Sequence, residues 1–540
     1  MLKIADSEEM QRIDRITIEK YGVPGTVLME RAGLSVAARI NDIYFQNTQE
    51  GTLNAAIIRE RKILVLCGGG NNGGDGFVIA RVLHNQGRRV EVYMTANPAS
   101  LKGDTKINYD AAKKFGVVIR PAGHFLKRVP SDVDRNCLIV DALLGTGLRK
   151  EVRAPLTDVI KKINHLPVPV VSVDIPSGIS SDTGQIMGCA VKARCTVTFG
   201  LPKRGHFLYP GAEYAGQLYV EEIGFPRTLL ASERIRINLV QKEDARSLIP
   251  VRPKYSHKGT YGHVLIVAGS RGKTGAALMA AKACLRAGAG LVTIGVPETL
   301  VNSFQSRVTE EMLLPLPDKG NGTLSIDAAG PVLDFLKKGV KVLAIGPGLS
   351  ADKEISKLAG ILIRESGSPI VIDADGLNAI SDQTSALRKS SAPVILTPHP
   401  GEMARLLRKG PAGSQRSDAA SGLREAIEKD RINTALDFAR KTKTFLVLKG
   451  APTITATPQG EAFINTTGNP GMATAGTGDV LTGMISAFLA QGMSPANASI
   501  LGVYLHGLAG DIVAGKKGQR SLIASDIISS LPMAFRSIRD

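Results

Sequence analysis

Residues 63–76 read ILVLCGGGNNGGDG, a continuous apolar run followed by a glycine-rich turn, and residues 77–87 continue as FVIARVLHNQG, a pattern typical of a helix. Gly68, Gly70 and Gly73 match the spacing G-x-G-x-x-G. Between a strand and a helix, this spacing brings backbone amides close to a bound phosphate at the start of the helix. The stretch therefore predicts a parallel α/β domain with an anion site.

The same alternation of apolar runs and helical patterns continues along the chain. Later runs include LIVDALLG (138–145), VVSVDIPSG (170–178), HVLIVAGS (263–270), IVIDADG (370–376) and FLVLKG (445–450). Each run is continuously apolar, as expected of strands buried on both faces of a sheet. We therefore predict parallel sheets covered by helices in both halves of the chain.

The length of 540 residues is too great for one ordinary domain. A polar stretch with Pro250 and Pro253 follows the first series of strands and separates it from the second. We expect a Rossmann-like three-layer domain over residues 1–235 and a second α/β domain over residues 236–540. The small polar segment 410–422 is expected to be an exposed loop.

The chain is strongly basic, with 67 Lys and Arg against 49 Asp and Glu and a net charge of +18. Both halves share the excess, aromatic residues are only 4%, and Trp is absent, so the composition speaks against a nucleic-acid binder. Five cysteines without a CxxC pair predict a reduced protein. The acidic N-terminus and the lack of long apolar runs predict a cytoplasmic protein that does not bind membranes.

Oxygen-bearing side chains gather where three predicted strands of the first half end. Asn71, Asn72 and Asp75 follow the first strand, Asp141 ends a second, and Asp174 with Ser177 follows a third. The carboxyl ends of parallel strands meet at one crevice, so these groups suit a hard cation and a carboxylate for proton transfer. Helix capping or turn bracing is the alternative role for these aspartates. A nicotinamide dehydrogenase is disfavoured, because no acid follows the next strand in VYMTAN (92–97).

The second half carries a different phosphate motif, AGTGDVLTG at residues 475–483. Gly476 and Gly478 allow amides to wrap a phosphate, and Asp479 at the helix start is a candidate base or a plain helix-terminal acid. Lys449 and Thr453 in LKGAPT, and His399 in TPHPGE, follow two other strands. GSRGKTG (269–275) is not a P-loop, because Val267 stands where the Walker motif needs Gly.

The first half resembles the N-terminal domain of the NAD(P)H-hydrate epimerases through GGGNNGGDG, DALLGTG, DIPSG and YGVPGTVLMERAG. The resemblance implies potassium held by Asn72, Asp141 and Ser177, and catalysis by Asp174, which contacts the hydrate. It also implies that the hydrated dinucleotide is bound by two segments, Asn71, Asn72, Gly73, Gly74 and Asp75, and Gly145, Thr146, Gly147, Leu148, Arg149, Lys150 and Glu151.

The second half resembles the ADP- or ATP-dependent NAD(P)H-hydrate dehydratases, which have a ribokinase-like fold, through GPGL, DADGLN, TPHPGE, KGAPT and GTGDVLTG. The resemblance implies that Asp479 acts as the base and that magnesium offsets charge. The adenine nucleotide would contact Lys449, Gly450, Ala451, Pro452, Thr453 and Gly478, and the hydrate would contact Ala276, Gly348, His399 and Asp479.

Together the halves predict a bifunctional repair enzyme that interconverts the R and S hydrates of NADH or NADPH and dehydrates the S form at the expense of ADP or ATP. We also expect a homo-oligomer. One alternative is a ribokinase-like vitamin or sugar kinase with a non-catalytic N-terminal nucleotide-binding domain. Another is a binding module, since relatives of the first half occur in mRNA-decapping scaffolds.

Overall fold

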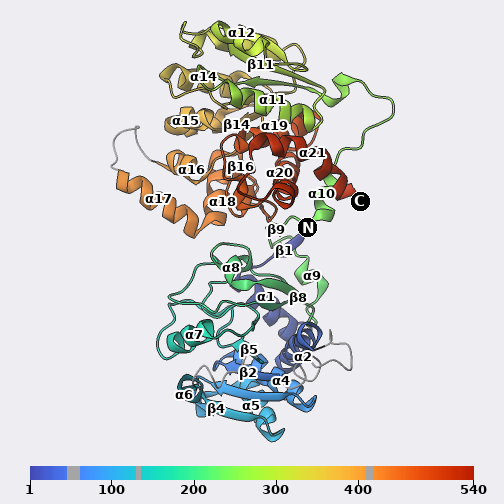
Figure 1. Cartoon of the computed structure of the whole chain (residues 1–540), viewed down its shortest axis with the longest axis vertical. Coiled ribbons are helices and arrows are strands. Elements are labelled where there is room, and N and C mark those ends of the chain that lie inside the picture. Colours follow the sequence, from blue (N-terminus) through green and yellow to red (C-terminus); the bar gives the residue numbers. More distant parts are fainter. Residues whose placement is uncertain (46–60, 129–135, 409–416, 540) are drawn as a thin grey trace. The chain divides into compact units, whose positions relative to one another are not determined.

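The computed structural model describes residues 1–45, 61–128, 136–408 and 417–539 (Figure 1). Its contacts divide the chain into two compact units. The N-terminal unit comprises Lys3–Ile235, and the C-terminal unit comprises Arg236–Asp540 together with Met1–Leu2. Each unit is built around one large sheet.

The N-terminal unit has a seven-stranded sheet in the order β4-β3-β2-β5-β6-β7-β8, in which every neighbouring pair is parallel. This is the strand order of a Rossmann fold with one added strand, so the predicted fold class is confirmed. The strands are β2 (Lys62–Cys67), β3 (Arg89–Met94), β4 (Val118–Pro121), β5 (Cys137–Ala142), β6 (Val170–Val173), β7 (Cys195–Phe199) and β8 (Gln217–Glu221).

Helices cover both faces of this sheet. Ile63 and Val65 of β2 face a core shared with α2 and α4, whereas Leu64 and Leu66 face a core shared with α6 and α7. Because neighbouring residues of a strand point to opposite faces, only a continuously apolar strand can serve both cores. The helices are α1 (Ser7–Glu19), α2 (Gly25–Tyr44), α4 (Asn71–Asn85), α5 (Gly103–Lys114), α6 (Ala122–Lys127), α7 (Leu156–His165), α8 (Gly211–Ala215) and α9 (Arg227–Leu230).

The C-terminal unit contributes to a sheet of order β1-β9-β18-β17-β16-β15-β14-β13-β10-β11-β12. The run from β16 to β12 is parallel, whereas β17 pairs antiparallel with both β16 and β18. The predicted α/β class is thus confirmed for this half too. The strands are β1 (Leu2–Ile4), β9 (Ile237–Leu239), β10 (His263–Val267), β11 (Leu291–Pro297), β12 (Met312–Leu316), β13 (Val342–Ile345), β14 (Ile370–Ile372), β15 (Val394–Leu396), β16 (Phe445–Leu448), β17 (Thr453–Ala456) and β18 (Ala462–Asn465).

One large core of the C-terminal unit lies between this sheet and α11, α19, α20 and α21. By length and composition α20 could cross a membrane, but two thirds of its most apolar window is buried in the protein, as in a core helix. The helices are α10 (Lys242–Leu248), α11 (Thr274–Arg286), α12 (Val301–Gln305), α13 (Ala329–Leu336), α14 (Lys353–Glu365), α15 (Asp375–Ile380), α16 (Pro400–Leu407), α17 (Ser417–Lys429), α18 (Arg431–Thr442), α19 (Thr477–Ala490), α20 (Pro495–Lys517) and α21 (Ala524–Arg539).

Only part of segment 410–422, which we expected to be an exposed loop, lies within the described residues. Residues 409–416 lie outside the described residues, but residues 417–422 form the start of α17, so that part of the prediction is wrong. Small residues such as Ser417 and Ala419 tolerate a helix when the segment that follows, LREAIEK, favours one.

Candidate active sites

The glycine-rich turn of the N-terminal unit places the start of α4 at the point where the strand order reverses, between β2 and β5. Asn71–Asp75, predicted as a loop, is the first turn of this helix. Its close packing requires glycine, because a Cβ at Gly68 would lie 1.9 Å from the Leu143 carbonyl oxygen. No described side chain caps α4, so the amides of its first turn are available to an anion.

A cavity of about 830 Å³ opens above these strand ends. Its volume falls in the range of sites for drug-sized ligands and cofactors. Helix α1 contributes Met10, Gln11 and Asp14 to its wall. The predicted substrate residues that line it are Asn71, Asn72, Asp75, Gly145, Thr146, Gly147, Leu148, Arg149, Lys150, Glu151 and Asp174. Gly73 and Gly74 are buried and do not line it.

Of the three predicted potassium ligands, Asn72 lines the cavity, and Asp141 and Ser177 are fully buried. Asp141 is fully buried and accepts hydrogen bonds from the Ser177 hydroxyl (2.6 Å), the Ser177 amide (2.9 Å) and the Ser172 hydroxyl (2.8 Å). Burial raises the pKa of Asp141, although these hydrogen bonds oppose it. Both amide atoms of Asn72 are buried and have no hydrogen-bond partner among the described residues. A buried amide oxygen beside a carboxylate and a hydroxyl fits a bound monovalent cation.

Asp174 is held by a cluster that the sequence did not reveal. The Lys203 ammonium, 2% exposed, lies 2.5 Å from Asp174 Oδ1, and the Thr198 hydroxyl donates to the same oxygen at 3.0 Å. Burial alone would raise the pKa of Asp174, but the Lys203 charge and the hydrogen bonds from Lys203 and Thr198 together outweigh it, so the pKa is lowered. Asp174 is therefore ionised at neutral pH.

His206 fixes the backbone of Asp174, which has the unusual φ of +66°. The Lys203 amide donates to His206 Nδ1 at 3.0 Å, so Nδ1 carries no proton. Nε2 therefore carries the proton and donates to the Asp174 carbonyl at 2.9 Å. Burial and the Lys203 charge lower the pKa of His206 to about 3, so the ring is neutral.

Asp75 lines the same cavity, but its pKa is shifted in the opposite direction. Burial, followed by the Asp174 charge, raises its pKa well above the ordinary value. The cavity thus combines a carboxyl group with a lowered pKa and one with a raised pKa, an arrangement suited to moving a proton onto and off a substrate.

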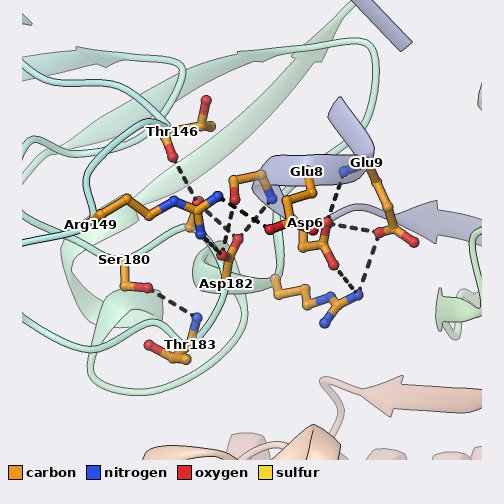
Figure 2. Close-up of polar contacts among 11 residues, drawn as sticks. Asp6, Glu8, Glu9, Thr146, Arg149, Ser180, Asp182 and Thr183 are labelled. Carbon is orange, nitrogen blue, oxygen red and sulfur yellow. Dashed lines mark hydrogen bonds and ion pairs between the residues drawn. The ribbon is translucent and has the colours of Figure 1, made fainter. Parts of the chain in front are cut away.

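The predicted substrate loop 145–151 is tied to α1 through Asp182 (Figure 2). Asp182 accepts from the Ser7 amide at 2.7 Å, the Ser7 hydroxyl at 3.0 Å and the Arg149 guanidinium at 3.2 Å. The Ser181 hydroxyl donates to the Thr146 carbonyl at 3.3 Å. Two walls of the cavity are therefore joined by a residue that does not itself line it.

In the C-terminal unit the predicted residues follow the parallel strands β13, β15 and β16, or lie at the starts of α11 and α19. The Lys449 ammonium lies 2.7 Å from Asp373 Oδ1, and the Thr482 hydroxyl of α19 donates to Asp373 Oδ2 at 2.8 Å. Burial and then the Asp373 charge raise the pKa of Asp479, in the first turn of α19, to about 7. Asp479 is thus poised to accept a proton near neutral pH.

Helix α19 begins with a turn that only glycine forms readily, since Gly476 has a φ of +90°. No described side chain caps this helix. A Cβ at Gly478 would lie 3.1 Å from Lys449 Nζ, so the predicted phosphate turn and Lys449 lie side by side. This arrangement offers amides and an ammonium to the same phosphate.

The loop Lys449–Thr453 has an unpredicted support in Arg431, which is 4% exposed at the start of α18. Its guanidinium donates to the carbonyls of Leu448, Lys449 and Pro452 at 3.4, 3.0 and 3.2 Å. Within the loop the Thr453 hydroxyl donates to the Gly450 carbonyl at 3.0 Å, and Ala451 precedes Pro452 in a cis peptide. A buried arginine thus orders the predicted nucleotide loop.

The three remaining predicted residues lie in two places. A Cβ at Gly348 would lie 3.2 Å from the Ala276 methyl, so the structure brings these two together. His399 caps α16, its Nδ1 accepting from the amides of Gly401 (3.0 Å) and Glu402 (3.3 Å). Burial, then the Lys449 and Arg405 charges, lower its pKa to about 4. Its observed contacts are therefore those of a neutral structural histidine.

Both halves of the chain are similar to known proteins. A family model described as YjeF-related protein N-terminus matches residues 25–205, and one described as NAD(P)H-hydrate dehydratase matches residues 264–533. The bifunctional NAD(P)H-hydrate repair enzyme Nnr of Moorella thermoacetica is 42% identical, with 99% of this chain and 97% of the relative covered. The enzyme of the same name from Thermofilum pendens is 39% identical, with 100% and 97% covered.

A solved structure resembles the C-terminal half. It is the ADP/ATP-dependent NAD(P)H-hydrate dehydratase of Bacillus subtilis, co-crystallised with ATP and Mg²⁺, at 30% identity and a TM-score of 0.47. The similarity covers 56% of this chain and 99% of that one. On the full-length sequence similarity, the chain belongs to the family of bifunctional NAD(P)H-hydrate repair enzymes.

Proposed function

We propose that residues 1–235 interconvert the R and S epimers of hydrated NAD(P)H, and that residues 236–540 dehydrate the S epimer at the expense of ADP or ATP. The observation that carries the first assignment is that one cavity is lined by Asp174, whose pKa is lowered, and Asp75, whose pKa is raised well above its ordinary value. The second rests on Asp479, with a pKa of about 7, at a helix N-terminus beside Lys449.

Epimer exchange leaves the number of protons on the substrate unchanged, so the site needs both a proton acceptor and a proton donor. Asp174 accepts a proton at the hydrated ring, and Asp75 returns one. Lys203 keeps Asp174 charged, and His206 keeps it oriented. The first-turn amides of α4 and the loop 145–151 hold the dinucleotide phosphates and ribose.

The residues present fit potassium, because the Asn72 amide oxygen is buried without a hydrogen-bond partner among the described residues, and Asp141 and Ser177 add a carboxylate and a hydroxyl. Asn72, Asp141 and Ser177 would hold the ion. A bound potassium ion supplies positive charge that stabilises a buried carboxylate and anionic substrate groups.

In the C-terminal site Asp479 takes the proton of the C6 hydroxyl as a phosphoryl group is transferred from the nucleotide to that oxygen. The C6–O bond then breaks to release phosphate, and a proton leaves the neighbouring C5, so that the ring double bond of NAD(P)H is restored. Lys449 and the amides of Gly476–Gly478 bind the phosphates, and the loop Lys449–Thr453 holds the nucleotide. Ala276, Gly348 and His399 would contact the hydrate.

The described residues contain no group of three or more His, Cys, Asp or Glu side chains placed to hold a metal ion. This fits Mg²⁺ that is bound mainly through nucleotide phosphates and water, as Mg²⁺ commonly is. Such an ion neutralises charge on the phosphates.

The test is to incubate the protein with each pure epimer and with ADP or ATP. We expect the S hydrate to regain reduced-nicotinamide absorbance with nucleotide alone, and the R hydrate to do so only through epimerisation. Absence of recovery from either epimer would refute the assignment and favour the sugar or vitamin kinase. Exchange of potassium for a large organic cation should slow recovery from R and not from S. A homo-oligomer in the cytoplasm remains our expectation, which light scattering and cell fractionation test.

A further inference from the structure

We propose that Asp373 is a positioning residue of the C-terminal site, which holds the Lys449 ammonium at the phosphate turn of α19 and keeps it away from Asp479. The inference rests on the dehydratase function proposed above. It assigns a role to a residue whose carboxylate is engaged by Lys449 and Thr482 and which acts through Lys449.

The contacts of Asp373 leave its carboxylate little freedom. The residue directly follows β14 and is 1% exposed. Each oxygen has its own donor, Lys449 for Oδ1 at 2.7 Å and Thr482 for Oδ2 at 2.8 Å. These donors come from two elements that handle phosphate, the loop after β16 and the helix α19. Asp373 therefore fixes the distance between the lysine and the helix.

The ammonium is held where a phosphoryl group would bind. A Cβ at Gly478 would lie 3.1 Å from Lys449 Nζ and 3.5 Å from Asp373 Oδ2, so both charged groups lie against the first turn of α19. The amides of that turn lack a side-chain cap among the described residues. A phosphate at the turn would thus receive the amides and the ammonium together.

Other charges around Lys449 show why an anchor is needed. Glu402 of α16 lies 3.9 Å from the ammonium, and Asp479 follows Gly478 directly. Asp375 at the start of α15 also acts on Asp479, while His399 of α16 and His506 of α20 are kept neutral by burial. Without Asp373, the ammonium is left with Glu402 and Asp479. Pairing with Asp479 would both remove the ammonium from the phosphate and weaken the base.

The experiment compares Asp373→Asn, Lys449→Met and the double variant in the dehydration of S hydrate. We expect kcat to fall about 100-fold in Asp373→Asn, the size of effect seen when one preorganised electrostatic group is lost. The KM of the hydrate should stay within about twofold if Asp373 acts through Lys449. The acidic limb of the kcat profile should move to lower pH, because Asp479 loses a neighbouring negative charge and gains a positive one.

The double variant should be no slower than Lys449→Met alone, within about twofold, because Asp373 has no lysine left to position. Multiplying losses, or an unmoved acidic limb, would overturn the proposal. If Asp373→Asn fails to fold, Thr482→Val removes one contact of the carboxylate and should give a smaller loss that again disappears in the Lys449→Met background. If Thr482→Val still lowers kcat in the Lys449→Met background, the proposal is likewise overturned.

Asp334→Asn is the matched control. Asp334 forms an ion pair of similar length with Lys337, 2.8 Å, but on the exposed surface of α13, and its loss should leave kcat unchanged. The wild-type protein distinguishes a failure of the proposed dehydratase function from a failure of the proposed role of Asp373. If it fails to dehydrate the hydrate, the proposed function fails; if it dehydrates the hydrate and the variant effects multiply, only the role of Asp373 fails.

Discussion

Replacement of Asp174 by Asn tests the N-terminal site most directly, because Asn keeps the shape of the side chain and removes its charge. The change leaves the Lys203 ammonium, 2% exposed, without its carboxylate. Breaking a buried ion pair from one side costs about 3–5 kcal/mol. Lys203 keeps the Thr198 hydroxyl at 2.7 Å and the Phe199 carbonyl at 3.2 Å, so we expect the lower end, about 3 kcal/mol.

A loss of about 3 kcal/mol leaves a domain of ordinary stability folded, since folded domains have about 5–15 kcal/mol. For a unit of this size it lowers Tm by about 6–12 °C. The effect on epimer exchange should be far larger, because removal of a proton-transfer group costs about 10²–10⁴ in rate. The loss of stability is therefore too small to explain the expected loss of rate, and the two effects can be measured separately.

The assay uses the second active site as an internal standard. Recovery of absorbance from pure R hydrate with nucleotide requires epimer exchange, whereas recovery from S hydrate does not. Asp174→Asn should slow the first by about 10²–10⁴, down to the spontaneous rate, and leave the second unchanged. Asp158→Asn, which changes an exposed carboxylate on the first turn of α7, is the control. A folded Asp174→Asn protein that recovers R hydrate at the wild-type rate would refute the assignment.

Three further predictions follow from other contacts. Since the pKa of Asp479 is about 7, kcat for dehydration should rise with pH through about 7 and then level; a flat profile across this range would exclude Asp479 as the base. Arg431→Met removes the donor to three loop carbonyls, so the KM of the nucleotide should rise about tenfold while that of the hydrate does not, and equal changes would contradict a role confined to the loop. The pKa of Asp174 is lowered in the folded protein, so ionised Asp174 stabilises the fold above the unfolded pKa of about 4. This stabilisation is lost as the pH falls from that value through the folded pKa. Urea unfolding should therefore show that acid lowers the free energy of unfolding more steeply for wild type than for Asp174→Asn.

The sequence predicts the sheets well, because a strand buried on both faces must be continuously apolar and such runs are easy to recognise. It also predicts that Asp141, Asp174 and Lys449 stand at the ends of strands, where the structure has them. It misses β17 and β18, since Thr453–Ala456 is short and directly follows the nucleotide loop. Local pattern does not distinguish a loop residue from the first residue of an antiparallel strand.

The residues that hold the two sites in place, Lys203 and Arg431, could not be predicted from the sequence for a different reason. Lys203 meets Asp174 because β6 and β7 are neighbours, and Arg431 meets the loop after β16 from a helix earlier in the chain. Such pairs depend on three-dimensional neighbourhood and carry no periodic signal. A lysine in LPKRGH or an arginine in KDRIN has the same appearance as a solvated surface residue.

The bridge made by Asp182 has a consequence for changing the range of substrates. It accepts hydrogen bonds from Arg149 of the loop 145–151 (Figure 2) and from Ser7 of α1, and it stands outside the cavity lining. A mutant library restricted to lining residues reaches this bridge only through Arg149 and leaves the contacts of Asp182 with Ser7 intact. Variation at position 182 acts on both ends of the bridge, so a search for enzymes that accept bulkier dinucleotides should include it.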